Sequence, residues 1–418
     1  MKDSFLPVVN KRKIFNDPVY GFISIPFELI FDLIEHPYFQ RLRRITQLGL
    51  SYYVYPGAYH TRFHHALGAL HLMTLALDVL QYKGHKVTRK EAEAACAAIL
   101  LHDIGHGPFS HTLENCLIPG VSHEFLSSRF MEALNADFRG RLSLAIDIFR
   151  DNYKKRFLHQ LISSQLDVDR LDYLKRDSFF TGVQEGVIGH DRIIKMLEVK
   201  DDRLVVEEKG IYSIEKFLVA RRLMYWQVYL HKTVLAAESL LVKIMQRAKE
   251  LALNNVSLDA SPPLKYFLYN NVSRKSFMDA EEPLEQFARL DDVDVLAAVK
   301  LWTRHPDTVL SLLCKALIER KLPKIELRNE PFPPARIERI KKAVKLHYEL
   351  SQREEDYFVY TSSTSNFAYD PEKGNINILY KDGRLMDITR ASDQLNISVL
   401  SRPVVKYYLC YPKFIALK

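Results

Sequence analysis

Histidine and aspartate, which serve metal and phosphate chemistry in proteins, gather in one stretch of this chain. Nine of its fifteen histidines lie between positions 60 and 123. In the densest part, LLHDIGHGPFSH at 100–111, His102 and Asp103 stand side by side where Gly105 should help to end an apolar helix. An imidazole and a carboxylate at a buried helix end are suitable joint ligands for a divalent metal. A lone His-Asp pair is more often a buried hydrogen-bonded pair, so a metal site needs further ligands.

Two more clusters can supply those ligands. The sequence TRFHH at 61–65 opens a long helix, and QLDVDRLDY at 165–173 lies on another. In order and setting, the three clusters resemble the HD-domain phosphohydrolase superfamily. The resemblance implies a metal site of four residues: His65, His102, Asp103 and Asp169. A metal there would polarise a phosphoryl oxygen and lower the pKa of bound water, and two His with two Asp suit Fe, Mn, Ni or Zn.

The resemblance becomes narrower when more of the chain is included. The sequence is similar, over roughly residues 11–250, to the deoxynucleotide triphosphohydrolases that combine a sterile alpha motif with an HD domain, and to their bacterial relatives. The matching segments are residues 39–43, 47–49, 52–58, 60–68, 167–177 and 221–232. The similarity implies metal-dependent cleavage of a deoxynucleoside triphosphate (dNTP) into deoxynucleoside and triphosphate, with Mg or Mn accompanying the phosphates. We expect no sterile alpha motif in this sequence.

The same resemblance assigns residues to proton transfer. It points to three histidines and an acidic residue: His106, His111, His123 and Glu114. Glu114 stands where the family commonly has Asp. We expect His111 to lie next to the scissile α-phosphate, with His106 and His123 orienting it, because a histidine can donate a proton near neutral pH. His106 would share a helical face with His102 if the helix persists that far.

Substrate contacts are implied as well. Arg62, Arg170 and Arg221 would bind phosphates, and Arg170 replaces the usual Lys with a side chain that keeps the charge and can bind bidentately. The other implied substrate contacts surround the sugar and the phosphates: Gln47, Leu48, Tyr173, Asp177, Tyr225 and Tyr229. Gln47 would meet the 3′-hydroxyl, and Leu48 would leave a 2′-hydroxyl without room or partner. Arg221, the two tyrosines and Lys232 would share one face of a helix, within an arc of roughly 80°.

A regulatory site follows from the resemblance in the same way. Animal relatives assemble an active tetramer around nucleotides at a second site. The corresponding positions here are Lys13, Glu35, Gln40 and Arg43, and Glu35 stands where the family often has Asp. The resemblance therefore implies an activating nucleotide and a homo-oligomer, a dimer or a tetramer.

Composition limits the alternatives. The 418 residues are 47% hydrophobic with a formal net charge of +8, which excludes disordered and fibrous classes. The competing functions are an HD phosphohydrolase for another nucleotide, such as a monophosphate, and a nucleic-acid-binding protein or nuclease. Basic residues do not alternate with aromatic ones, so we expect no nucleic acid as partner. No apolar run approaches the roughly 18 residues that a spanning helix needs, so we expect no membrane as partner either. Residues 1–13 hold no apolar signal segment, and we expect a cytoplasmic protein.

The predicted fold is mainly α: a helical bundle of the HD-domain type with a small C-terminal α+β region. Apolar periodicity predicts the helices 26–35, 62–81, 89–106, 122–134, 167–176 and 214–253, and further helices between 264 and 322 and at 335–349. Strand composition marks 203–207, 356–361, 375–380, 384–389 and 404–410, with an Asp-Gly turn at 381–384. The linker at 254–263 and the prolines near 331 divide the chain into three parts: an HD core at 1–253, a helical extension at 264–330 and the α+β region at 335–418.

Overall fold

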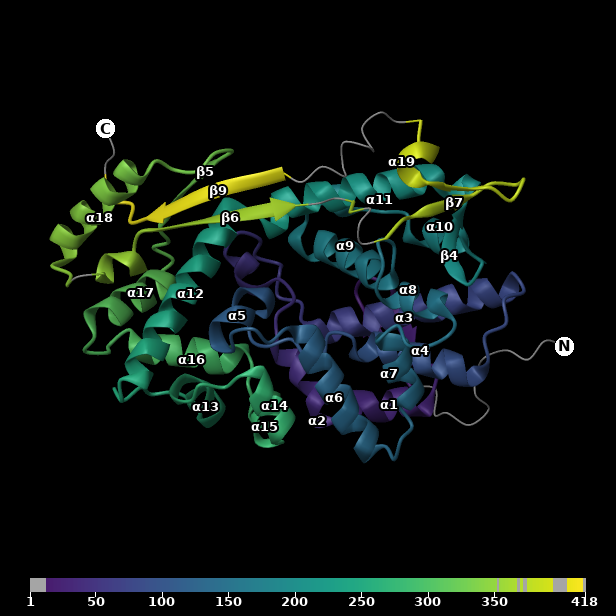
Figure 1. The fold of residues 1–418 in the computed structure, drawn as a ribbon, viewed down its shortest axis with the longest axis horizontal. Helices are drawn as coiled ribbons and strands as arrows, with labels where there is room; N and C mark the ends of the chain where they lie inside the picture. Colours follow the sequence, from purple (N-terminus) through teal and green to yellow (C-terminus); the bar gives the residue numbers. More distant parts are fainter. Residues whose placement is uncertain (1–12, 352, 367–368, 371–373, 394–403, 416–418) are drawn as a thin grey trace.

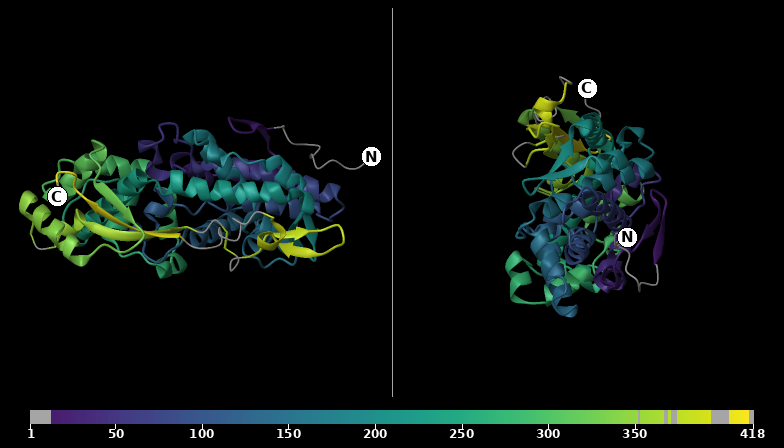
Figure 2. Two further views of the ribbon diagram at one scale, coloured as in Figure 1. Left: turned by 90° about the horizontal axis from the view of Figure 1, so that it is seen from above. Right: turned by 90° about the vertical axis from the view of Figure 1, so that its right-hand side faces the viewer.

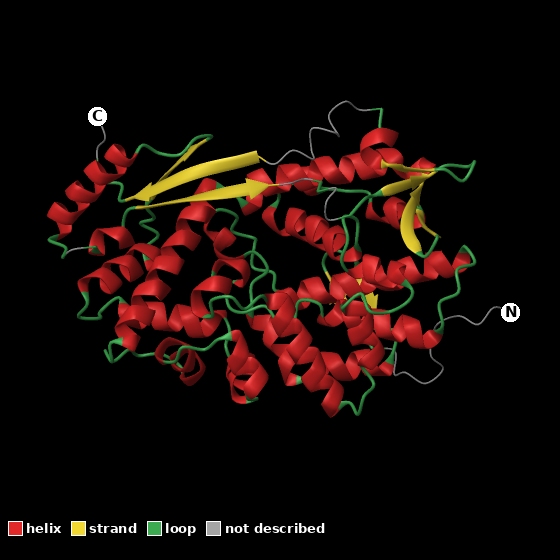
Figure 3. Ribbon diagram, viewed as in Figure 1, coloured by secondary structure: helices red, strands yellow, loops and turns green. Residues whose placement is uncertain are grey.

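The computed structural model describes residues 13–351, 353–366, 369–370, 374–393 and 404–415. The first twelve residues, where we expect no signal segment, lie outside this range. The described residues form an elongated, mainly helical body with two of its three small sheets along one side (Figures 1 and 3). The predicted class, mainly α with a small C-terminal α+β region, is confirmed.

The N-terminal helices pack around α3 and carry most of the predicted site. In chain order they are α1 Glu28–Glu35, α2 Pro37–Gln40, α3 Arg62–Tyr82, α4 Arg89–Leu101, α5 Glu114–Leu117, α6 His123–Asp137, α7 Ser143–Phe149, α8 Arg156–Ile162, α9 Val168–Thr181 and α10 His190–Lys195. Side chains cap the N-termini of several of these helices. In α4 the Thr88 hydroxyl accepts a hydrogen bond from the Glu91 amide, and in α9 the Asp167 carboxylate accepts one from the Arg170 amide. Both α4 and α9 pack against α3, so the three predicted metal-binding segments are brought together.

Two predicted helices are shorter than expected. The helix predicted at 89–106 ends at Leu101, so His106 does not share a helical face with His102. The chain turns here because Gly105 packs directly on α6: a Cβ at Gly105 would lie 2.2 Å from the backbone oxygen of His123. The single helix predicted at 214–253 is interrupted between its two halves. It consists of α11 Ile211–Met224, a π-helical turn at Tyr225–Tyr229, and α12 Lys232–Leu253, which the His231 side chain caps.

The C-terminal half adds a second group of helices beside α12. They are α13 Pro262–Tyr269, α14 Arg274–Asp279, α15 Glu282–Ala288, α16 Asp292–Trp302, α17 Thr308–Ile318 and α18 Pro334–Tyr348, whereas the short α19 Ile388–Ala391 packs against α11. Helix α17 packs against both α12 and α16. One hydrophobic core runs from Ile23 through this group to Tyr411. The three domain boundaries drawn from the sequence remain predictions.

Three small sheets complete the fold, and the C-terminal residues contribute to two of them. The strands are β1 Ile14–Asp17, β2 Gly21–Ser24, β3 Leu197–Lys200, β4 Arg203–Glu207, β5 Lys324–Arg328, β6 Tyr360–Asn366, β7 Asn377–Leu379, β8 Leu385–Asp387 and β9 Val404–Tyr411. Strands β1 and β2 form an antiparallel hairpin, which lies at the edge of the helical body (Figure 2). The other sheets have the orders β3-β4-β7-β8 and β5-β9-β6. The predicted Asp-Gly turn joins β7 to β8.

The strand predicted at 356–361 is displaced along the chain. Residues Glu354–Tyr357 form a 3-10 turn, and β6 begins at Tyr360. Strands β1, β2, β3 and β5 were not predicted. Helix α3 is the one helix among the described residues that is long and apolar enough to cross a membrane; 67% of its apolar window is buried inside the protein.

Candidate active site

The four predicted metal ligands meet where α3, the end of α4 and the start of α9 come together. His65 Nε2 lies 3.1 Å from Asp169 Oδ1 and 3.7 Å from Asp103 Oδ2. His102 Nε2 lies 3.4 Å from Asp169 Oδ1, 3.4 Å from Asp103 Oδ1, and 3.4 Å from His65 Nε2. Two imidazole nitrogens and two carboxylates thus converge on one small volume. Their role as ligands remains a prediction.

Hydrogen bonds at Nδ1 orient the two histidine rings of the cluster. His65 donates through Nδ1 to Asp172 Oδ2 at 2.8 Å, and His102 donates through Nδ1 to the Ile99 carbonyl at 2.6 Å. Each imidazole therefore points Nε2 toward the cluster, the arrangement in which histidines ligate metals. Burial lowers the pKa of His65, but hydrogen bonds to Asp169 and Asp172 outweigh it and raise the pKa to about 10. Two imidazole nitrogens and two carboxylates form a donor set that fits a divalent cation: the two histidines, Asp103 and Asp169 would hold it, and it would take the place of the proton on His65 Nε2.

The cluster opens into a pocket of about 490 Å³. All nine predicted substrate contacts line it: Gln47, Leu48, Arg62, Arg170, Tyr173, Asp177, Arg221, Tyr225 and Tyr229. Arg62 bonds Asp103 and donates from Nε to Ser110 Oγ at 2.8 Å. Arg221 donates to Gln165 Oε1 at 3.3 Å. The structure therefore brings three guanidinium groups to the wall of one cavity beside the metal cluster.

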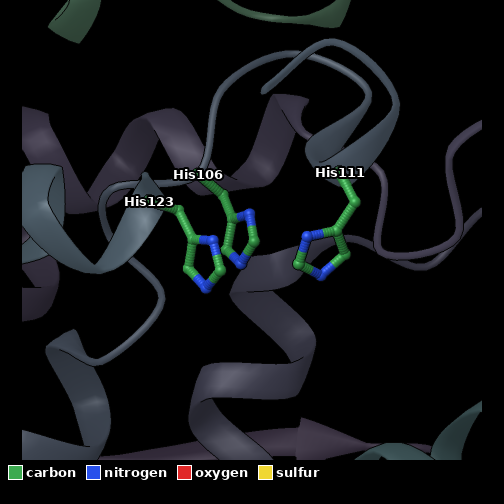
Figure 4. A group of neighbouring side chains, drawn as sticks. All are labelled: His106, His111 and His123. Carbon is green, nitrogen blue, oxygen red and sulfur yellow. The ribbon is translucent and has the colours of Figure 1, made fainter. Parts of the chain in front are cut away.

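The three predicted catalytic histidines form a second cluster at the pocket wall (Figure 4). The rings of His106 and His123 stack with centroids 3.9 Å apart, and His111 meets both rings edge-on. Glu114 holds two of them: His123 Nδ1 lies 2.8 Å and His111 Nδ1 3.2 Å from its carboxylate oxygens. Glu114 itself does not line the pocket. Glu114, whose side chain is longer than that of the Asp expected here, therefore contacts both histidines from the side away from the pocket.

The environment gives these histidines different proton affinities. Burial, together with the nearby Arg62, holds the pKa of His106 well below its ordinary value, so this ring is neutral. Burial also lowers the pKa of His123, but the hydrogen bond to Glu114 outweighs it, and the net pKa is raised. The side chain of His111 is 69% exposed. The pocket wall therefore combines one neutral imidazole with a neighbour whose pKa is raised.

The predicted sugar contacts form a hydrogen-bonded wall. Asp177 accepts from Tyr229 and from His60 Nε2, both at 2.7 Å. Gln47 presents a buried side-chain oxygen, Oε1, that has no hydrogen-bond partner. The π-helical turn at Tyr225–Tyr229 sets the direction of both tyrosines, and such turns are frequent at functional sites. Lys232 lies beyond this turn, exposed and outside the pocket lining, so the predicted four-residue stripe ends at Tyr229.

The predicted regulatory residues lie apart from this pocket. The Lys13 ammonium sits over the Phe31 ring at 2.8 Å, and Arg43 sits over Phe63 at 3.6 Å while donating to Gln40 Oε1 at 2.8 Å. Glu35 is exposed at the end of α1. Lys13 immediately precedes β1, Glu35 and Gln40 are the last residues of α1 and α2, and Arg43 lies in the 3-10 turn that follows. Their role in nucleotide binding remains a prediction.

Several residues of the site were not predicted. Asp292 of α16 accepts from the Phe109 amide at 2.8 Å and so fixes the loop that carries His111. Glu238 of α12 lines the pocket, and burial raises its pKa to about 7. Neither has a neighbouring motif in the sequence that could have revealed it. Asp172 could have been found, because it lies three residues after Asp169, on nearly the same face of α9.

Family comparison agrees with this geometry. The model of the HD domain matches residues 62–177, and that of the HD associated region matches residues 188–261. A crystal structure of a phosphohydrolase from Bacteroides thetaiotaomicron is 56% identical, covers 96% of this chain and 100% of its own, and superposes with a TM-score of 0.93.

Two further relatives, compared by sequence, match different fractions of this chain. The uncharacterized protein YwfO of Bacillus subtilis is 31% identical over 97% of this chain and 93% of its own length. The human deoxynucleoside triphosphate triphosphohydrolase SAMHD1 is 30% identical over 54% of this chain and 42% of its own length. This chain therefore spans less than half of the human enzyme.

Proposed function

The chain belongs to the HD-domain phosphohydrolase family, and we propose that it is a metal-dependent dNTP triphosphohydrolase. The reaction converts a dNTP and water into a deoxynucleoside and inorganic triphosphate. One observation carries the proposal: a single pocket of about 490 Å³ is lined by carboxylates of the metal cluster, the three histidines and the three arginines. The similarity to human SAMHD1, an enzyme with this activity by its name, supports the choice of substrate.

The charges in the pocket favour a triphosphate over a monophosphate. Arg62, Arg170 and Arg221 come from the first turn of α3, the first turn of α9 and the last turn of α11. A triphosphate carries several negative charges along its length, and guanidinium groups on separate helices can meet them one after another. A divalent cation at the four ligands would polarise a phosphoryl oxygen and lower the pKa of bound water.

Protonation of the leaving group is the part played by the histidines. Water attacks the α-phosphorus, the bond from phosphorus to the 5′-oxygen breaks, and that oxygen leaves with a proton. We assign proton donation to His123, whose pKa the hydrogen bond to Glu114 raises. His111, which the resemblance places next to the phosphate, is hydrogen-bonded to the other oxygen of the same carboxylate and lines the pocket. A positioned acid of this kind typically accelerates such a step by about 10²–10⁴-fold. Neutral His106 packs between these residues and Asp103 and orients them.

The pocket wall also supports a preference for deoxyribose over ribose. Leu48 offers an apolar surface, while Gln47 Oε1 and the Tyr229–Asp177 pair offer polar groups. A 2′-hydroxyl pressed against Leu48 would lose its hydrogen bonds to water, at a cost of about 1–3 kcal/mol. We therefore propose that ribonucleotides are hydrolysed roughly 5–150-fold more slowly than their deoxy counterparts.

The test is incubation of metal-stripped protein with each dNTP and NTP, after single additions of Mn, Mg, Fe or Zn. Products are separated by ion-exchange chromatography. We expect inorganic triphosphate and deoxynucleoside, abolished in His102→Ala and retained in His347→Ala, which removes an exposed histidine of α18. Release of phosphate or pyrophosphate would keep the family's chemistry but contradict the proposed cleavage. Equal rates with NTPs would contradict the role of Leu48.

A further inference from the structure

A buried chain of charged groups connects the metal cluster with the N-terminal hairpin. Asp172, whose Oδ2 accepts from the metal-facing His65, also accepts from Arg176: Nε to Oδ2 at 3.0 Å and Nη2 to Oδ1 at 3.1 Å. Arg176 donates onward to Asp17 Oδ2 through Nη1 at 2.8 Å. Asp17 is the last residue of β1, 159 positions earlier in the sequence. We call His65, Asp172, Arg176 and Asp17 the hairpin–metal network.

The network is enclosed, so none of its charges can be satisfied by water. The side chains of Asp172 and Arg176 are 0% exposed, and that of Asp17 is 4% exposed. Gly68 of α3 packs against the pair: a Cβ at this position would lie 2.0 Å from Asp172 Oδ1 and 2.2 Å from Arg176 Nη2. These distances leave room only for glycine. The positions of both charged groups are therefore fixed by the backbone of the helix that carries His65.

At its other end, the network is tied to the turn of the hairpin. Asp17 Oδ1 accepts from the amides of Val19 and Tyr20, both at 2.9 Å, so the carboxylate that reaches Arg176 also shapes the turn between β1 and β2. The Tyr20 ring lies 5.5 Å from the Arg176 guanidinium and covers it. Moving the hairpin away would leave a buried guanidinium with one carboxylate in place of two, which is costly in a dry interior.

We propose that the β1–β2 hairpin holds the metal centre in its binding geometry, with Asp17 and Arg176 acting as positioning residues through Asp172 and His65. Asp172 fixes the orientation of the His65 ring, and a partner of this kind typically changes metal affinity by about 10–100-fold. Arg176 holds Asp172, and Asp17 holds Arg176. The inference rests on the proposed function, because it requires the four-ligand cluster to bind a metal.

The test measures Mn²⁺ affinity of the full chain at 10 °C by competition with a chelator, with circular dichroism confirming that each variant is folded. We expect Asp17→Asn to weaken Mn²⁺ binding by about tenfold. The matched control, Asp32→Asn, removes an exposed carboxylate of α1 and should bind as the original chain does. Asp17→Glu keeps the charge but shifts it by one methylene, and we expect a smaller loss; it replaces Asp17→Asn if that variant does not fold.

A double variant separates this mechanism from a general loss of stability. If Asp17 acts through Asp172, then Asp17→Asn should have little further effect on Mn²⁺ affinity in a chain that already carries Asp172→Asn. Unchanged affinity in both Asp17 variants, or fully additive losses in the double variant, would overturn the inference while leaving the proposed function intact. Absence of binding of Mn²⁺, Fe²⁺, Ni²⁺ and Zn²⁺ alike in the original chain would overturn both.

Discussion

Glu238 provides a test of the pocket's electrostatics that needs no substrate. Its carboxyl lies at the pocket wall under the Gly49 backbone, where a Cβ on Gly49 would stand 3.1 Å from Oε1. Burial raises the pKa of Glu238 from 4.5 to about 7, and only a hydrogen bond from Thr112 opposes this. The folded protein therefore binds this proton more tightly than the unfolded chain does. Its stability should fall as pH rises from about 4.5 to 7.

The size of the effect follows from the two pKa values. A tenfold difference in proton affinity corresponds to about 1.4 kcal/mol, so a rise from 4.5 to about 7 amounts to roughly 3 kcal/mol. This is an upper value, because the Glu238 side chain is partly exposed to the pocket. The variant Glu238→Gln has nearly the same shape and cannot ionise. Compared with the original chain, it should gain up to about 3 kcal/mol in relative stability between pH 4.5 and pH 7.

Urea unfolding of both proteins at several pH values, without nucleotide, measures this difference. Infrared spectroscopy provides an independent check, because the band of protonated carboxyls at pH 6 should be weaker in Glu238→Gln; the remaining band is expected from Asp167 and Asp292, whose pKa values burial raises to about 6. A stability difference that stays constant from pH 5 to pH 8, or that shrinks as pH rises, would refute the reasoning. A protonated Glu238 would also be able to donate a hydrogen bond to a bound nucleotide.

Further predictions concern the metal, the acid and the packing of α3. Removing the metal with a chelator should lower the melting temperature, and Mn²⁺ at 100 times its dissociation constant should restore about 2.7 kcal/mol; a melting curve indifferent to Mn²⁺ would count against the site. In Glu114→Gln the pKa of His123 should fall, because its carboxylate partner is lost. Since His123 must be protonated to act as an acid, the loss of activity at high pH should then begin at a lower pH, and an unmoved pH–rate profile would remove Glu114 from the mechanism. Gly68→Ala should cost about 1–3 kcal/mol of stability by overpacking and should weaken Mn²⁺ binding, because the new methyl group displaces Asp172. Arg221→Ala should raise KM for dNTPs, as seen in steady-state kinetics, whereas an unchanged KM would place the triphosphate elsewhere.

The sequence predicted the site best where a short segment shows both its secondary structure and its candidate ligands. His102 and Asp103 follow an apolar helix, and Asp169 lies on a helix with clear apolar spacing, so their convergence on α3 required only the packing of three helices. Long-range contacts were beyond such reasoning. Asp292 reaches Phe109 across 183 positions, and no pattern near either residue indicates the contact.

Local irregularities account for the remaining differences. The π-helical turn at Tyr225–Tyr229 adds a residue to one helical turn, which periodicity cannot detect in an apolar sequence. The hairpin strands β1 and β2 are four residues each and show little alternation. They are stabilised by their pairing and by the contact of Asp17 with Arg176, which the sequence does not reveal.

The most direct test of the proposed reaction is hydrolysis of a mixture of the four dNTPs in ¹⁸O-labelled water with Mn²⁺, followed by mass spectrometry of the products. Attack of water on the α-phosphorus predicts one ¹⁸O atom in inorganic triphosphate and none in the deoxynucleoside. Label in free phosphate or pyrophosphate would place the attack at another phosphorus. Label in the deoxynucleoside would mean that the carbon–oxygen bond breaks, and either result would contradict the account.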